Sequence, residues 1–407
     1  MRATSANKKP PVPVPLWELF WIFLRIASTS FGGFMAMISV VQNVVVERRK
    51  LLSHPDMLDG ISLAAILPGP FAMNVVAYVG YRLRGGWGAF VCAFAAVLPA
   101  FVAIVLASVA YFRWGQLPAI GKLFMGLAPA VTAIIVAAAL TMGRKAVTGL
   151  REAALALAAS AALLGAGGFF STLGIILVAG AVGWWWFRGT EKSPGERVPG
   201  GRAKMRRKSA RKRLDANMFL LAGMPASIVP FLSMEPSILL KLFVTFAGMS
   251  LLLFGGGYVF IPLMQEIVVD GHGWVTRQEF IDAVAMGQIM PGPALVSAAF
   301  IGLKVAGFAG ALLATIGIFA PSAIVMVLCA NVLDRIRNSV IVEAALHGVR
   351  AAVVGMVFAA AVVIGKTAIP GWASAVIFVT ALVALLRFRI EAVWVIPPAA
   401  LIGYLVY

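Results

Sequence analysis

The feature that most constrains this chain is a Pro-Gly-Pro break inside an apolar segment, because the chain contains it twice. Leu67-Pro68-Gly69-Pro70 has a counterpart 223 residues later in Met290-Pro291-Gly292-Pro293. A Phe-Gly-Gly cluster precedes each break at the same spacing, starting at Phe31 and at Phe254. Further downstream, glycines, prolines and a basic residue recur 222 residues apart, so one residue was lost between the break and Gly80. The chain is therefore one unit duplicated, and this repeat sets its architecture.

The composition places this duplicated unit in a membrane. Hydrophobic residues make up 61% of the 407 residues and charged residues only 12%, whereas soluble domains average about 25% charged. Several apolar runs reach the roughly 20 residues that a spanning helix needs. We therefore predict an all-α polytopic membrane protein with two homologous repeats and about 10 to 12 membrane segments. The Pro-Gly-Pro helices within it are broken or re-entrant.

A basic linker divides the chain into three parts. We assign residues 1–187 to the first repeat, 188–235 to the linker and 236–407 to the second repeat. Between Arg188 and Arg213 there are 11 Lys and Arg against two Glu, a net of +9 out of the chain's total of +18. The positive-inside rule predicts a cytoplasmic linker, close to anionic lipid headgroups. No aromatic residues alternate with these basic residues, so we expect no nucleic-acid partner.

The relation between the repeats depends on whether the Pro-Gly-Pro segments cross the membrane. If each segment re-enters, each repeat makes five crossings and the repeats are inverted, as in many secondary transporters. If each segment crosses, six crossings per repeat give a parallel pair. The loop after the first apolar element is basic in repeat one, at Arg48 to Lys50, and mostly acidic in repeat two. We favour the inverted arrangement, because acidic residues contribute little to the charge rule.

Each break can end one half-helix and start another. A proline is tolerated at the first helical position, where the N–H lacks an intrahelical partner, and glycine lets the backbone turn before it. The N–H groups that follow Pro70, from Phe71 to Met73, together with the positive end of the helix dipole, would face an anion. Ala294 begins the equivalent turn after Pro293. The alternative is a proline kink whose freed groups bond to neighbouring helices, but matching breaks in two halves point to a transport site at the repeat interface.

Other small and polar residues extend this candidate site. The glycine clusters are either substrate-facing breaks or small-residue packing seams between helices. Two polar residues in the first turns after the breaks either add hydrogen-bond donors or bond to nearby carbonyl groups. These candidate residues are Gly32, Gly33, Gly255, Gly256, Asn74 and Ser297.

Cations inside the apolar zone are few, and each is a candidate for the site. Arg82 and Lys304 occupy equivalent places after the two breaks, where they would either attract an oxyanion or anchor the helix at the interface. Arg25 lies in the middle of the first apolar element, and its equivalent position in repeat two is Gly248. An unpaired cation there needs a partner or a dianion, so we include Arg25 in the substrate site.

No enzymatic signature accompanies these features. The sequence has no phosphate-binding loop, no nucleophile elbow and no paired catalytic carboxylates, and its two cysteines lie in apolar runs. His54 and His272 have no metal-ligand neighbour at helical spacing, and His347 has a single one, Glu343. We expect no enzyme activity, no cofactor and no metal, with transport driven by a proton or other coupling ion or by the substrate's own gradient.

Two repeats that each carry Phe-Gly-Gly, Pro-Gly-Pro and Gly-x-Arg/Lys, separated by a hydrophilic linker, resemble the long-chain, two-domain chromate ion transporter family. The likeness covers residues 16–187 and 236–407. It implies a multi-pass inner-membrane protein that exports chromate, a tetrahedral dianion like sulfate, and so confers chromate resistance. A homodimer is kept as a candidate assembly. The alternatives are a transporter of sulfate or another small anion, an integral-membrane enzyme, and a structural scaffold.

Overall fold

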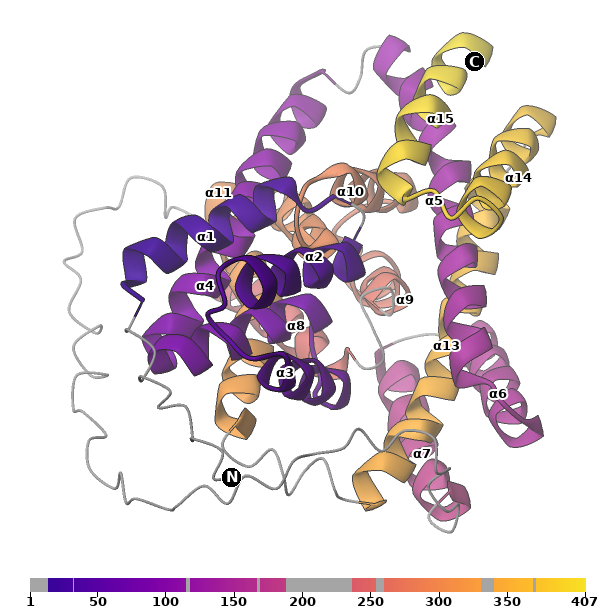
Figure 1. Ribbon diagram of the computed structural model, residues 1–407. Helices are drawn as coiled ribbons and strands as arrows, with labels where there is room; N and C mark the ends of the chain where they lie inside the picture. The colour runs from indigo at the N-terminus through magenta and orange to yellow at the C-terminus, as the bar shows by residue number, and fades with distance from the viewer. Residues whose placement is uncertain are drawn as a thin grey trace, which may run out of the picture.

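The computed structural model describes residues 14–31, 33–114, 118–166, 169–187, 236–253, 260–330, 340–368 and 371–407. Over these residues the chain forms helices and no strand (Figure 1), which confirms the all-α prediction. The whole of the predicted linker, together with Gly32, Gly255 and Gly256, lies outside the described residues.

The helices of the first repeat are α1 (Leu16–Thr29), α2 (Gly33–Gln42), the π-helix η1 (Asn43–Arg48), α3 (His54–Ile66), α4 (Phe71–Trp114), α5 (Pro118–Ala146), α6 (Leu150–Ala166) and α7 (Phe169–Phe187). The second repeat has the same order in α8 (Pro236–Leu252), α9 (Phe260–Met264), the π-helix η5 (Gln265–Gly271), α10 (Arg277–Ile289), the short 3-10 helix η6 (Ala294–Val296), α11 (Ser297–Cys329), α13 (Val340–Ala368), α14 (Trp372–Leu386) and α15 (Ala392–Val406). The first apolar element is interrupted between the end of α1 at Thr29 and the start of α2 at Gly33.

Helix α4 has a short arm and a long arm that fold back on each other. The backbone leaves the helical region at Arg84 and Gly85, where φ of Gly85 is +64°. A Cβ placed on Gly80 would lie 2.4 Å from the carbonyl oxygen of Gly88, although residues eight apart in one straight helix are about 12 Å apart. Helix α11 repeats this bend at Gly307, where φ is +59°. The two short arms therefore run from the breaks to these bends.

Each short arm also pairs with the helix before its break. A Cβ on Gly60 of α3 would lie 2.4 Å from the ring of Tyr78 in α4, and Asp56 at the start of α3 forms an ion pair with Arg82 at the end of the arm. The α3 helix and this arm thus form an antiparallel helical hairpin, with Pro-Gly-Pro at its tip. A 13-residue helix is about 20 Å long, which is shorter than the roughly 30 Å of bilayer hydrocarbon.

The two repeats are interlocked through their long helices. Helix α5 of the first repeat packs against α14 and α15 of the second, and α13 of the second packs against α6 and α7 of the first. Figure 1 shows α5 and α13 running through one side of the molecule with these partners beside them. Helices α4 and α11 are also in contact. Each repeat therefore completes the other's packing.

Within the described residues, four helices are long and apolar enough to cross a membrane. They are Phe71–Trp114, Gly121–Arg144, Ala294–Cys329 and Ala344–Gly365, which are two equivalent pairs in the two repeats. Further apolar helices of 10 to 17 residues surround them, α14 and α15 among them. This pattern is that of a polytopic membrane protein.

Candidate anion-binding site at the two Pro-Gly-Pro breaks

Each Pro-Gly-Pro break is held by the opposite repeat. The backbone N–H of Gly69 donates a hydrogen bond to the carbonyl oxygen of Leu253 at 2.7 Å, and that of Gly292 donates to the carbonyl oxygen of Ser30 at 2.9 Å. Leu253 and Ser30 are equivalent residues, just after the ends of α8 and α1. These reciprocal bonds place both breaks at the repeat interface, where the sequence predicted a site.

Only glycine fits the middle position of each break. Gly69 has φ of +116° and Gly292 has φ of +111°, a region that side chains disfavour. A Cβ on Gly69 would lie 2.1 Å from the Cβ of Ser322 in α11, and a Cβ on Gly292 would lie 3.2 Å from the Cβ of Ala100 in α4. Ser322 and Ala100 are again equivalent positions. Each break therefore packs closely against a long helix of the other repeat, the first against α11 and the second against α4.

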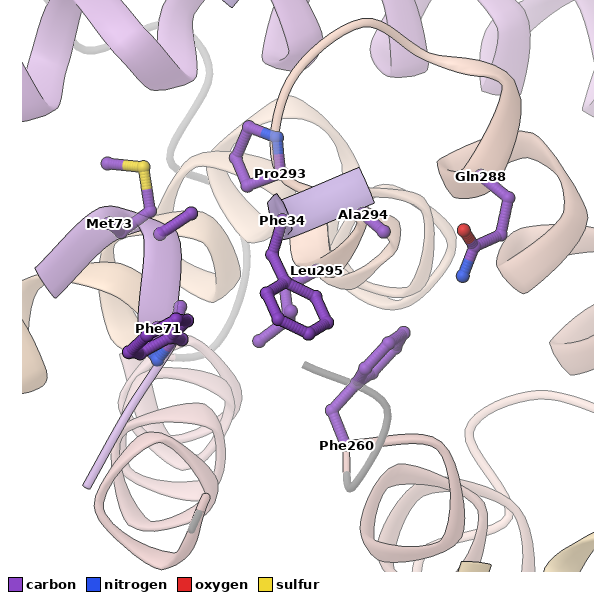
Figure 2. Close-up of a pocket in the computed structure, with 10 residues that line it drawn as sticks. Phe34, Phe71, Met73, Phe260, Gln288, Pro293, Ala294 and Leu295 are labelled. Atoms are coloured by element: carbon purple, nitrogen blue, oxygen red, sulfur yellow. The ribbon is translucent and has the colours of Figure 1, made fainter. Parts of the chain in front are cut away.

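The residues that follow the two breaks line one shared cavity (Figure 2). Its first-repeat wall runs from Pro70 to Met73 and its second-repeat wall runs from Pro293 to Leu295. Phe34, Phe260 and Gln288 complete the lining. The N-terminus of α4 and that of η6, which continues into α11, thus open on the same space. N–H groups in a first helical turn have no intrahelical partner, so the cavity is supplied with donors and positive helix ends from both repeats.

Gln288 supplies the one polar side chain of this lining. It is 6% exposed, and its amide nitrogen Nε2 has no hydrogen-bond partner among the described residues. Figure 2 shows its amide group turned toward the space between Phe260 and Ala294. A buried amide donor without a partner carries a free-energy cost of about 1–3 kcal/mol, which a bound acceptor would remove. Gln288 was not predicted from the sequence, because its equivalent in the first repeat is Ala65.

The cavity is narrow in this conformation. Its volume is about 20 Å³, which has room for roughly one water molecule. A tetrahedral oxyanion has five heavy atoms in place of one, so the walls must separate before one enters. The structure therefore shows the two breaks close together with the space between them largely closed.

Asn74 and Ser297 lie beside the breaks and outside the cavity lining. The Asn74 amide nitrogen Nδ2 donates to the carbonyl oxygen of Pro68 at 3.0 Å, which is the backbone-bonding alternative for this residue. Its Oδ1 atom and the Ser297 hydroxyl are buried without a partner among the described residues. Asn74 therefore stabilises the turn of the first break.

Arg82 and Lys304 each form an ion pair at the base of a hairpin. Arg82 contacts Asp56 at 2.6 Å, and Lys304 contacts Glu279. Asp56 and Glu279 are themselves equivalent, so both hairpins close in the same way. Partial burial raises the pKa of each carboxyl group, but hydrogen bonds outweigh this effect and hold both pKa values below their usual range. The donors are Ser53 and Arg82 at Asp56, and Lys304 and Thr276 at Glu279. The role of the two cations in substrate contact stays a prediction.

Arg25 lies in a different cavity from the two breaks. It lines an open cleft of about 660 Å³ between α1 and the α2–η1 segment, together with Arg48 and Arg49. Arg49 also forms an ion pair with Glu18 at 2.6 Å. Thr29 lines this cleft, and its neighbour Ser30 accepts the bond from Gly292. The basic cleft therefore adjoins the second break at the end of α1.

The glycine clusters are only partly described. Gly33 begins α2, and the adjacent Phe34 lines the cavity, while Phe260 at the start of α9 does so in the second repeat. In the described part of the chain, no three His, Cys, Asp or Glu residues gather closely enough to hold a metal ion.

Comparison with known proteins identifies the family. The family model described as chromate transporter matches residues 17–184 and again residues 240–404. The chain belongs to the chromate transporter family. The double match to one model also agrees with the duplication in the sequence.

Three relatives match this chain over almost their own whole length. The chromate transport protein of Cupriavidus metallidurans is 28% identical over 409 residues, covering 99% of this chain and 96% of that protein. The chromate transport protein of Pseudomonas aeruginosa is 26% identical over 412 residues, covering 100% and 95%. The uncharacterized transporter YwrA of Bacillus subtilis is 31% identical over 169 residues, covering 40% of this chain and 95% of that protein. No solved structure matches this chain.

Proposed function

We propose that this protein carries chromate across the cell inner membrane, in the direction of export, and so confers chromate resistance. The observation that supports this most is the shared cavity, where a helix N-terminus from each repeat and the amide of Gln288 face one space. Two helix ends contribute partial positive charge without any bulky cation. Such a pocket suits a doubly charged tetrahedral oxyanion.

We further propose that the two hairpins re-enter the membrane rather than cross it. The arms of each hairpin are about 20 Å long, and the ion pair of Asp56 with Arg82 ties both ends of the first hairpin to one side. Each repeat then makes five crossings, and the repeats are inverted. Rocking of one repeat against the other would open the closed cavity to each side in turn.

The basic cleft serves as the approach to this pocket. Arg25, Arg48 and Arg49 line it, and the equivalent positions of repeat two are Gly248, Gly271 and His272. A cleft lined by one sign of charge raises the local concentration of the opposite ion. Anions therefore gather on the first-repeat side and reach the breaks past Thr29 and Ser30.

Flux of radiolabelled chromate into proteoliposomes tests this proposal. We expect saturable uptake above that of protein-free liposomes, and we expect excess sulfate to compete according to how closely it matches the pocket. Uptake no greater than in protein-free liposomes would overturn the proposed substrate.

Variants of the two breaks separate a transport site from a scaffold. Pro68→Ala and Pro291→Ala are expected to lose chromate flux while membrane protein levels stay near normal. Pro398→Ala, in the exposed face of α15, is the matched control and should retain flux. Loss of protein rather than of flux in the first two variants would favour a purely structural role for the breaks.

A further inference from the structure

Helix α10 carries a buried carboxyl group that the anion pocket does not use. Asp282 is 1% exposed. One of its carboxylate oxygens accepts a hydrogen bond from the hydroxyl of Tyr111 at 2.7 Å, and the other accepts from the amide of Gln278 at 3.0 Å. Both donors are neutral groups.

No cation of the described chain compensates this carboxylate. The groups that act on Asp282 are Tyr111 of α4, Gln278 and Glu279, and the Glu279 carboxylate is itself held by Lys304 of α11. Among the other described elements packed on α10, η5 carries Glu266 and Asp270 and α5 carries Lys122. None of these three belongs to the groups that act on Asp282. The electrostatic surroundings of Asp282 are therefore neutral to negative.

Such surroundings favour a carboxyl group that can bind a proton. Removing a carboxylate from water without a cation costs several kcal/mol, and the group responds by taking up a proton. Two neutral hydrogen bonds offset part of this cost and favour the ionised form. A group under these opposed influences can exchange its proton in response to small changes in its environment.

The position of Asp282 connects it to the pocket. Tyr111 belongs to the long arm of α4 in the first repeat, so its bond to Asp282 crosses the repeat interface. Gln288 lies six residues further along α10, about 9 Å along the same rigid helix. A change at Asp282 that moves α10 against α4 would therefore move Gln288 at the pocket.

The second repeat alone has this arrangement in sequence. Asp59 is the equivalent of Asp282, but Pro55 stands at the position of Gln278 and Leu333 at the position of Tyr111. Neither of these residues can supply the hydrogen bonds that Asp282 receives. Asp59 thus provides a matched control within the same chain.

We propose that Asp282 is the coupling-ion site, binding and releasing one proton in step with anion movement through the pocket. In this step a proton from water joins a carboxylate oxygen and later leaves it, and no other covalent bond changes. The tyrosine bond across the interface is strongest when Asp282 is ionised, so protonation loosens the contact between the repeats. This inference rests on the proposed function, because coupling requires transport.

Two modes of chromate flux in proteoliposomes test it. Counterflow of labelled against unlabelled chromate at equal pH requires the pocket and its rocking, and net accumulation under an imposed pH gradient also requires a proton site. Asp282→Asn is expected to keep counterflow within about twofold of wild type and to lose accumulation driven by the gradient. Asp59→Asn is expected to keep both.

The outcomes are distinguishable. If Asp282→Asn accumulates chromate as well as wild type does, the proton site is overturned and the chromate assignment stands. The same conclusion follows if wild type shows counterflow but no accumulation under any pH gradient. Absence of wild-type counterflow would instead overturn the proposed function, and with it this inference.

Infrared spectroscopy on the full-length protein gives a readout that needs no chromate. The component of the protonated-carboxyl carbonyl stretch that belongs to Asp282 should titrate with pH in wild type and in Asp59→Asn. This component should be missing in Asp282→Asn, in which the components of the other carboxyl groups remain. If Asp282→Asn does not fold, Tyr111→Phe replaces it, and loss of the hydroxyl donor should move this titration to higher pH. A titration unchanged from wild type in Asp282→Asn or in Tyr111→Phe would overturn the proposal.

Discussion

The backbone N–H of Gly69 donates a 2.7 Å hydrogen bond to the carbonyl oxygen of Leu253, which belongs to the other repeat. The bond joins the tip of one hairpin to the end of the first helix of the opposite unit. Its counterpart joins Gly292 to Ser30. The geometry of the pocket is therefore a property of the pair of repeats, and a change at one break is felt at both.

Gly69→Ala is expected to destabilise the protein. The positive φ disfavours a side chain, and the new Cβ would meet Ser322 at 2.1 Å, an overpacking that typically costs on the order of 1–3 kcal/mol. Thermal unfolding of the detergent-solubilised protein should show a lower midpoint. Gly86→Ala is the control, because no heavy atom lies within 4 Å of a Cβ at Gly86. Equal midpoints for the two variants would contradict the close packing at the break.

Gln288→Leu is expected to weaken chromate binding without loss of stability. A hydrogen bond to a charged group contributes about 1.5–3 kcal/mol, so the Kd should rise about tenfold or more. Replacing the unpartnered Nε2 donor with an apolar group removes a buried cost, so the unfolding midpoint should hold or rise. Gln265→Leu changes another buried glutamine that does not line the pocket, and it should leave chromate affinity unchanged. The same Kd in both variants would exclude Gln288 from the site.

The double variant Asp56→Arg/Arg82→Asp is expected to recover the unfolding midpoint and the chromate flux that Arg82→Ala loses. Exposed ion pairs contribute about 0–1 kcal/mol, so the single variant should lower the unfolding midpoint and the chromate flux only modestly. The reversed pair restores an ion pair between α3 and the short arm of α4. Flux measured in proteoliposomes decides between the two roles of Arg82. Flux that stays lost in the double variant would show that the anion needs the cation at position 82.

Arg25→Gln is expected to raise the KM for chromate at low ionic strength more than at high ionic strength. Salt screens an exposed charge over about 10 Å at 0.1 M, so an electrostatic approach should weaken as salt increases. Wild type should show a rising KM across a salt series, and the variant a flatter one. Arg387→Gln, at an exposed position after α14, serves as the control. If the KM for chromate depends on salt in the same way in wild type and Arg25→Gln, the cleft is not on the route by which anions reach the pocket.

The sequence predicted the breaks well because helix-breaking residues carry their own signal. Proline and glycine in an apolar segment mark an interruption without reference to any partner, and the duplication placed both interruptions at one interface. The ion pairs at the base of the hairpins could have been predicted from the sequence, since Asp56 and Glu279 are equivalent positions, as Arg82 and Lys304 are.

Other features depended on packing that the sequence does not display. Arg25 was predicted to belong to the substrate site, and it precedes Ser30 by five residues, about 140° around the helix. Arg25 lines the basic cleft, whereas the carbonyl oxygen of Ser30 accepts the hydrogen bond from Gly292. Gln288 breaks the symmetry of the repeats, so repeat comparison could not reveal it. An amide three residues before a break, in the apolar C-terminal half of α10, was the one available signal.

Crystallographic anomalous scattering at the chromium absorption edge, on crystals of the full chain grown with chromate, tests the central claim most directly. The account predicts a chromium peak between the N-terminus of α4 and that of η6, with chromate oxygens within hydrogen-bond distance of the Phe71 and Ala294 turns and of Gln288 Nε2. A chromium peak elsewhere, with the space between the two breaks filled by side chains as it is now, would contradict it.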